Sequence, residues 1–89
     1  SNVGIEKEEK LNLKIFPNPS DGKISIFSEQ LTGQEVHISI FDIQGKEFYT
    51  KKTRFVSNTV QLDLNLPKGS YQISLKIEGK AITQMLIIE

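Results

Sequence analysis

Apolar and polar side chains alternate with a period of two over most of this chain. Successive side chains of a strand point to opposite faces, so each alternating stretch predicts a strand with one buried side. No stretch has the 3.6-residue period of an amphipathic helix, and the sequence therefore predicts an all-β fold. The expected strands are Leu11–Ile15, Lys23–Phe27, Val36–Ile40, Lys46–Lys51, Val60–Leu64, Tyr71–Ile77 and Ala81–Ile88.

The length of 89 residues suits one domain and leaves little room for a second. Short strands at intervals of about 8–12 residues are typical of an antiparallel sandwich or barrel. Tyr71 follows the turn Leu66-Pro67-Lys68-Gly69 at the start of the sixth expected strand. Immunoglobulin-like sandwiches place a tyrosine there, with its hydroxyl bonded to nearby backbone. We therefore predict a seven-stranded antiparallel immunoglobulin-like β-sandwich.

Turn residues separate the expected strands. Pro17 and Pro19 cannot continue a ladder because proline lacks an N–H, and Asp21-Gly22 supplies residues that tolerate or favour positive φ. This run predicts a stiff bend between the first two strands. Asp42-Ile43-Gln44-Gly45 has the residue pattern of a type I turn, and Glu78-Gly79 suits a tight hairpin.

Composition narrows the classes of partner. Eleven basic and eleven acidic residues cancel, so nothing favours a nucleic acid or an anionic membrane surface. The absence of cysteine excludes disulfides and cysteine-ligated zinc. The longest apolar run, Met85–Ile88, is too short to cross a bilayer. We expect no nucleic-acid partner and no transmembrane segment.

The first ten residues differ in composition from the rest of the chain. They are polar and rich in charge, which predicts a solvated linker, and Ser1-Asn2 is typical of what remains after a tag is cleaved. We therefore expect a linker with a tag remnant over residues 1–10 and a domain over residues 11–89. We interpret the chain as a fragment of a larger protein that ends at that protein's own C-terminus.

Residues suited to catalysis or metal binding are few. The only histidine, His37, lies between Val36 and Ile38, which should face inward, so its own side chain should face solvent. Two turns and one outward strand position explain Asp21, Asp42 and Asp63, and no calcium-loop spacing is present. We expect neither an enzyme nor a cofactor or metal site.

The last expected strand does not alternate cleanly. Ile82, Gln84, Leu86 and Ile88 would share one face, and Ala81, Thr83, Met85 and Ile87 the other, which leaves apolar groups on both faces. Two interpretations stay open. The strand is covered on one side by the N-terminal segment, or its apolar edge is kept available for a partner that adds a strand or docks side chains.

Aromatic residues support an alternative function. Phe41 should point outward or lie at a strand end, and adjacency means that one of Phe48 and Tyr49 must face out. Exposed aromatic side chains are a common feature of sugar-binding faces. The alternative is a carbohydrate-binding or adhesive immunoglobulin-like accessory module of a secreted enzyme.

Four motifs follow one another along the chain: Pro17-Asn18-Pro19 with Gly22, Asp42 with Gly45-Lys46, Gly69-Ser70-Tyr71, and Lys80 followed by Met85-Leu86-Ile87-Ile88. In this order they resemble the type A C-terminal sorting domain of the type IX (Por) secretion system of Bacteroidetes. The resemblance covers about residues 11–89. In place of the lysine that the family commonly carries before its last apolar residues, this chain has Gln84-Met85, which leaves Lys80 as the nearest basic candidate.

The resemblance implies a transport signal whose recognition residues are those of the four motifs. It implies an upstream cargo domain in the same chain, transit through the periplasm, and recognition by outer-membrane type IX components. It further implies that a sortase-like cysteine protease removes the domain in the preceding linker. The cargo would then be secreted or attached to the cell surface.

Overall fold

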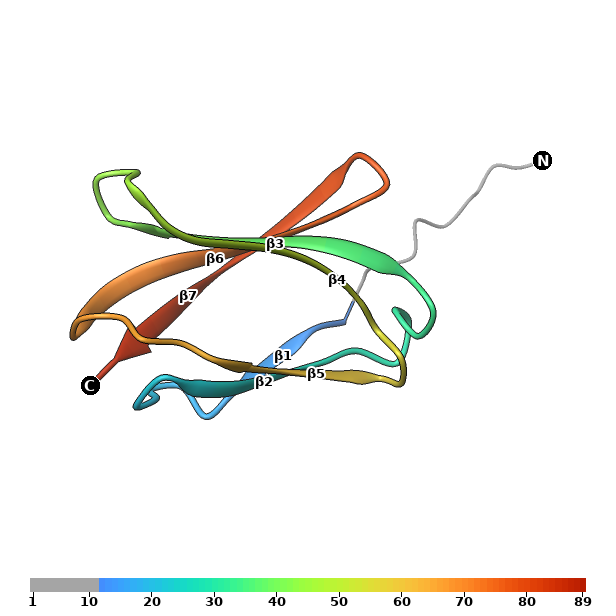
Figure 1. Ribbon diagram of the computed structural model, residues 1–89, viewed down its shortest axis with the longest axis horizontal. Helices are drawn as coiled ribbons and strands as arrows, with labels where there is room; N and C mark the ends of the chain where they lie inside the picture. The colour runs from blue at the N-terminus through green and yellow to red at the C-terminus, as the bar shows by residue number, and fades with distance from the viewer. Residues whose placement is uncertain (1–11) are drawn as a thin grey trace.

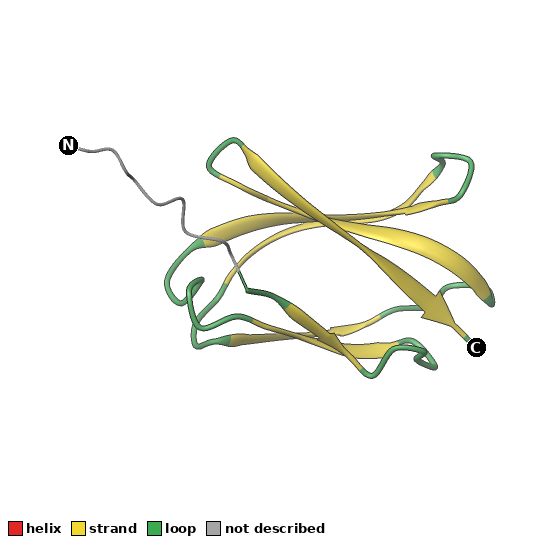
Figure 2. Cartoon of the chain, turned by 180° about the vertical axis from the view of Figure 1, so that it is seen from behind, coloured by secondary structure: helices red, strands yellow, loops and turns green. Residues whose placement is uncertain are grey.

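Seven strands form two antiparallel sheets in the computed structural model, which describes residues 12–89 (Figure 1). One sheet has the order β1-β2-β5 and the other the order β4-β3-β6-β7. Figure 2 shows only strands and loops in the described part of the chain. The predicted all-β sandwich is confirmed. The strands are β1 (Lys14–Phe16), β2 (Lys23–Phe27), β3 (Glu35–Asp42), β4 (Glu47–Arg54), β5 (Thr59–Asp63), β6 (Gly69–Ile77) and β7 (Lys80–Ile88).

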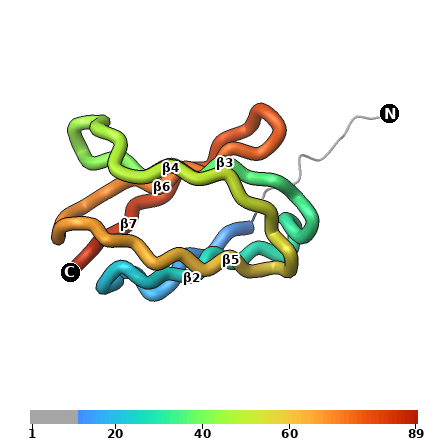
Figure 3. Tube along the Cα trace, viewed as in Figure 1, coloured from blue at the N-terminus to red at the C-terminus, as the bar shows by residue number. Residues whose placement is uncertain are grey.

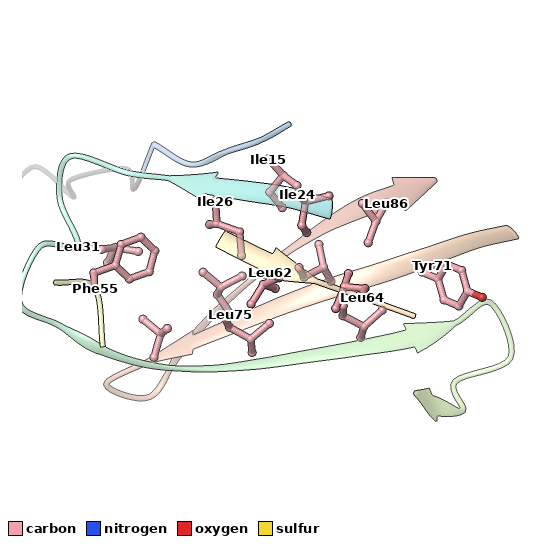
Figure 4. Close-up of a cluster of buried hydrophobic side chains, with 14 of the residues drawn as sticks. Ile15, Ile24, Ile26, Leu31, Phe55, Leu62, Leu64, Tyr71, Leu75 and Leu86 are labelled. Atoms are coloured by element: carbon pink, nitrogen blue, oxygen red, sulfur yellow. The ribbon is translucent and has the colours of Figure 1, made fainter. Parts of the chain in front are cut away.

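Hairpins join β1 to β2, β3 to β4, and β6 to β7, whereas the other three connections cross between the sheets (Figure 3). The inward side chains of both sheets meet in one core (Figure 4). Burial of this apolar surface is the main force that holds the sheets together. The side chains with no measurable exposure include Ile26, Ile38, Ile40, Phe55, Ile73, Leu75 and Leu86.

The bounds of the first strand differ from expectation. The ladder between β1 and β2 begins at Lys14 opposite Phe27, whereas we expected the strand to run from Leu11 to Ile15. Leu13 precedes the ladder and packs against the core without belonging to the strand. Alternation alone cannot separate an extended residue that packs from one that pairs, because both place every second side chain inward.

The connector between β2 and β3 contains no strand, as expected, but it closes one end of the core. Leu31 on this connector is 2% exposed and Phe55 after β4 is fully buried. Backbone bonds hold the two segments together: Gly33 N–H donates to Phe55 O at 2.7 Å, and Phe55 N–H donates to Gln34 O at 3.0 Å.

A bulge in the β3–β4 hairpin lies beside the adjacent aromatic residues Phe48 and Tyr49. Tyr49 pairs with Ile40 and Glu47 pairs with Phe41, so Phe48 is an extra residue with no partner opposite. A bulge interrupts the strict alternation of the strand that carries it. Tyr49 packs against the core, whereas Phe48 is 38% exposed, as the prediction that one of the two faces out requires, although its ring also touches the core residue Tyr71.

Two of the predicted turns and the predicted tyrosine corner are present. Gly45 N–H donates to Asp42 O at 3.0 Å, the closing bond of a type I turn, and Gly45 has φ +89°. In the β6–β7 hairpin, Glu78 and Gly79 both have positive φ, which is typical of a type I′ turn. The Tyr71 hydroxyl donates to Pro67 O at 2.6 Å, so the predicted tyrosine corner is present.

Candidate functional site

Most residues of the four motifs lie at one end of the sandwich. In the four-stranded sheet, Tyr71 pairs with Asp42 on one side and with Leu86 on the other. Next to this row, Gly69 pairs with Ile88, which in turn forms a parallel bridge with Ser20. Figure 1 shows the C-terminus, the β1–β2 connection, the β3–β4 turn and the start of β6 at the same end, on the left. We call this surface the motif end: Pro17–Gly22, Asp42–Lys46, Gly69–Tyr71 and Met85–Ile88.

Lys80 does not belong to the motif end. It pairs with Ile77 at the turn of the β6–β7 hairpin, which is the opposite end of β7 from Ile88. Eight residue steps at about 3.3 Å each place Lys80 roughly 26 Å from the end of the strand. The structure thus brings together every residue of the predicted set except this lysine.

The first motif covers the edge of the last strand. The Asn18 side chain donates from Nδ2 to Met85 O at 2.9 Å and accepts at Oδ1 from Ile87 N–H at 3.0 Å. The backbone continues the pattern, because Ser20 N–H donates to Ile87 O at 2.9 Å and Ser20 O accepts from Glu89 N–H at 2.8 Å. We call residues Pro17–Ser20 the strap. Its side-chain amide and its backbone together pair with β7 as a short parallel strand would.

Local bonds shape the segment that follows the strap. Ser20 is 4% exposed, and its hydroxyl accepts from Gly22 N–H at 2.9 Å and donates to Lys23 O at 3.1 Å. Gly22 has φ +122°, and a Cβ there would lie 2.5 Å from Leu64 O. Only glycine fits this close approach to the backbone that follows β5. Ser20 was not among the predicted residues, although a buried serine that bonds backbone groups within three residues is a recognisable turn pattern.

The second and third motifs meet through Phe48. Lys46 Nζ lies 5.3 Å from the centre of the Phe48 ring, and that ring contacts Tyr71 edge-on with centres 5.6 Å apart. Asp42 orders the turn that presents Lys46, since its Oδ1 accepts from the backbone N–H of Gln44 and of Lys46, each at 2.9 Å. Sequence reasoning did not assign Phe48 to this cluster because the bulge that turns it toward Tyr71 could not be placed in advance.

The inner and outer faces of β7 are as predicted. Leu86 and Ile88 are buried in the core, whereas Met85 on the outer face is 58% exposed. Residues that precede β2 cover half of the strand edge, as the first interpretation expected, and the second interpretation stays a prediction for the other half. The strap covers the edge from Met85 to Glu89, while nothing in residues 12–89 pairs with the edge groups of Ala81 and Thr83.

Titratable side chains form no cluster suited to metal binding within residues 12–89. His37 lies on the outer face, where its Nε2 is 2.7 Å from Thr50 Oγ1, as its predicted outward position requires. Burial raises the pKa of the Tyr49 phenol above its ordinary value. In the part of the chain that the structure describes, no helix has the length and apolar character needed to cross a membrane.

The three aromatic residues of the alternative function do not share a face. Phe41 pairs across the sheet with Gln72 on the outer face, whereas Tyr49 pairs with the buried Ile40 and packs inward. The Phe48 ring is partly covered by the Tyr71 ring, which contacts it edge-on. The geometry gives no support to a flat aromatic platform for sugar binding.

These features define a small immunoglobulin-like β-sandwich whose characteristic turns and last strand gather at one end. The sequence matches the family described as the secretion system C-terminal sorting domain over residues 14–89. The chain belongs to this family, the sorting domains of the type IX secretion system. The family is one of sorting signals rather than enzymes, and its signal directs proteins across the outer membrane toward the cell surface or the extracellular space. No match was found among curated proteins.

Proposed function

We propose that this domain is the export signal of a cargo protein joined to its N-terminal side, and that outer-membrane components of the secretion system recognise the motif end. Membership of the sorting-domain family supports the role in export. The observation that carries the proposed location is that the first motif is bonded to the last strand, with Asn18 on Met85 and Ile87. A single surface thus presents residues that the sequence holds far apart.

The proposed sequence of events has the cargo pass through the periplasm and then reach the surface. A sortase-like cysteine protease cuts in the linker over residues 1–10 and joins the cargo to the cell surface. This linker lies outside the described residues. Its support is the charge-rich run Glu6–Lys10, which is the composition of a solvated and accessible segment.

The export role is tested with a periplasmic reporter fused ahead of residues 11–89 in a host that has the type IX system. The expected result is reporter activity outside the cell, with the same reporter lacking the domain as control. A reporter that stays in the periplasm with the domain folded and intact would contradict the proposal.

Cleavage is tested on the exported material by mass spectrometry of the new ends. The expected cut lies within residues 1–10 and requires the active cysteine of the protease. Surface reporter that still carries residues 11–89 in the presence of active protease would disprove the cleavage step while leaving the export role in place.

A further inference from the structure

The backbone of β7 alternates between pairing with β6 and facing the edge of the sheet. The two-residue turn at Glu78-Gly79 makes Ile77 and Lys80 a hydrogen-bonded pair, so even-numbered residues of β7 bond to β6. The strap confirms this phase, because it bonds to the odd-numbered residues Met85, Ile87 and Glu89. The register with β6 has no shift along β7. Ala81 and Thr83 therefore also direct their N–H and C=O groups outward.

These outward groups have no hydrogen-bond partner among residues 12–89. The strap ends its pairing at Met85 O, which leaves the N–H of Met85 and both groups of Ala81 and Thr83 open. From Ala81 to Ile88 the strand carries no charged side chain. A regular and uncharged edge of this kind is a template for pairing with another strand.

The opposite edge of the same sheet is protected. Lys51 on β4 pairs with Ile38, which is fully buried, so Lys51 lies on the core-facing side of the edge strand while remaining exposed. A strand added there would bury its ammonium group, and such inward-pointing charges are a known device against edge pairing. The edge at β4 is therefore protected from strand addition by a charge, whereas the edge at β7 is covered by the strap over part of its length.

We propose that the edge of β7 from Ala81 to Met85 binds an extended, uncharged segment of the protein that recognises this domain, by addition of a strand to the four-stranded sheet. The strap shows that the neighbouring part of the same edge accepts an extended segment, since Asn18 and Ser20 form four bonds to Met85, Ile87 and Glu89. The added strand continues that ladder toward the hairpin turn. This inference rests on the proposed function, because it names how the receptor of the export signal is bound.

Proline at position 83 tests the proposal. Proline removes the N–H of residue 83 and places its ring on the edge, yet an edge strand tolerates it where the N–H faces solvent. Thr83→Pro should therefore leave the fold intact and lower export of the reporter by about tenfold, the equivalent of roughly one lost hydrogen bond. Thr83→Val is the matched control, since it keeps the N–H and should export as wild type does. Ala81→Pro serves in the same way if Thr83→Pro does not fold.

Export of a folded Thr83→Pro variant at the wild-type level would overturn the proposal and leave the export role intact, whereas failure of the wild-type fusion would overturn both.

Hydrogen exchange on the isolated chain tests whether another segment of this chain, or a second copy of it, covers the edge instead of the receptor. The amides of Ala81 and Thr83 should exchange fast and that of Ile87 slowly. Protection of Thr83 that disappears when residues 1–11 are deleted would overturn the proposal in favour of the chain's own linker. A dimer in sedimentation that Thr83→Pro dissociates would overturn it in favour of a second copy.

Discussion

Polar side chains at the motif end act mainly by forming hydrogen bonds with backbone groups that the turns and sheet edges leave unpaired. Asn18 bonds Met85 and Ile87, Asp42 bonds the turn that follows it, and Tyr71 bonds Pro67. A hydrogen bond of this kind contributes about 0.5–1.5 kcal/mol to stability, and the bond from Tyr71 is partly buried whereas those of Asn18 and Asp42 are exposed. The polar residues of the motifs therefore stabilise this end of the domain whatever their part in recognition.

Asn18→Ala should lower the free energy of unfolding by about 1 kcal/mol, because two exposed hydrogen bonds to β7 are lost and water replaces them in part. The amide of Ile87 should exchange faster with solvent, since Asn18 Oδ1 is its acceptor. Chemical denaturation and hydrogen exchange measure the two effects. Asn65→Ala, at an exposed loop position, is the control and should change neither.

Tyr71→Phe should cost about 1–2 kcal/mol, because the Pro67 carbonyl loses its donor beside a largely buried ring. Tyr49→Phe is the matched control. The Tyr49 hydroxyl has no hydrogen-bond partner within residues 12–89, so its removal should change stability by less than about 0.5 kcal/mol near neutral pH. Equal losses in thermal or denaturant unfolding would contradict the assignment of a tyrosine corner.

Tyr49 should also make the domain sensitive to alkali. Burial raises the pKa of this phenol in the folded protein, so folding favours the neutral form. The resulting stability is fully present below the ordinary value of 10.0 and is lost as the pH rises through the raised pKa. Unfolding measured as a function of pH should show a shallower alkaline decline for Tyr49→Phe than for wild type.

At the scale of elements, the two edges of the four-stranded sheet are protected in different ways. β4 carries Lys51 on its core-facing side, whereas β7 relies on hydrogen bonds from the strap. A charge blocks pairing permanently, because an added strand would have to bury it. A strap that covers only Met85–Glu89 leaves the remaining edge of β7 open to a partner.

Lys51→Val should promote self-association through β4, because the variant removes the charge that an added strand would bury. The expected observation is a rise in light scattering or in sedimentation coefficient at high protein concentration. Lys52→Val is the control, since Lys52 pairs with His37 on the outer face and does not point into the sandwich. If both variants stay monomeric alike, Lys51 is not the feature that protects this edge.

At the scale of the whole molecule, β7 is part of the core as well as of the candidate recognition surface. Deletion of Met85–Glu89 removes Leu86 and Ile88 from the core and the partners of the strap. Each buried aliphatic side chain is worth about 2–5 kcal/mol against a total stability of about 5–15 kcal/mol. The truncated chain should therefore be unfolded by circular dichroism, and its expected failure in export would reflect lost folding. A folded truncation product would contradict this.

Sequence reasoning predicted elements better than contacts. β2 has the expected bounds, and the type I turn at Asp42 and the tyrosine corner are present. The differences lie where two segments must be placed in register, as in the first strand and at the bulge beside Phe48. Register depends on the partner strand, which a single segment's periodicity does not encode.

The candidate site shows the same difference between what the sequence predicts and what depends on contacts. Its residues were named from motifs and turn chemistry, but their meeting at one end, and the separation of Lys80 from them, depend on the strand pairing. Ser20 and Phe48 were missed because their roles lie in contacts with residues from other elements or with nearby turns.

The amino-acid sequence by itself determined the fold class, the approximate strands, the turns and the family resemblance, because periodicity and turn preferences are local properties of the chain. Only the tertiary structure decided that the strap closes half of the β7 edge and leaves the other half open. That arrangement rests on hydrogen bonds between Asn18 and two residues of the last strand, Met85 and Ile87, which lie 67 and 69 positions later in the sequence. Such bonds depend on the packing of both sheets around the core, which brings the first connection and the last strand together.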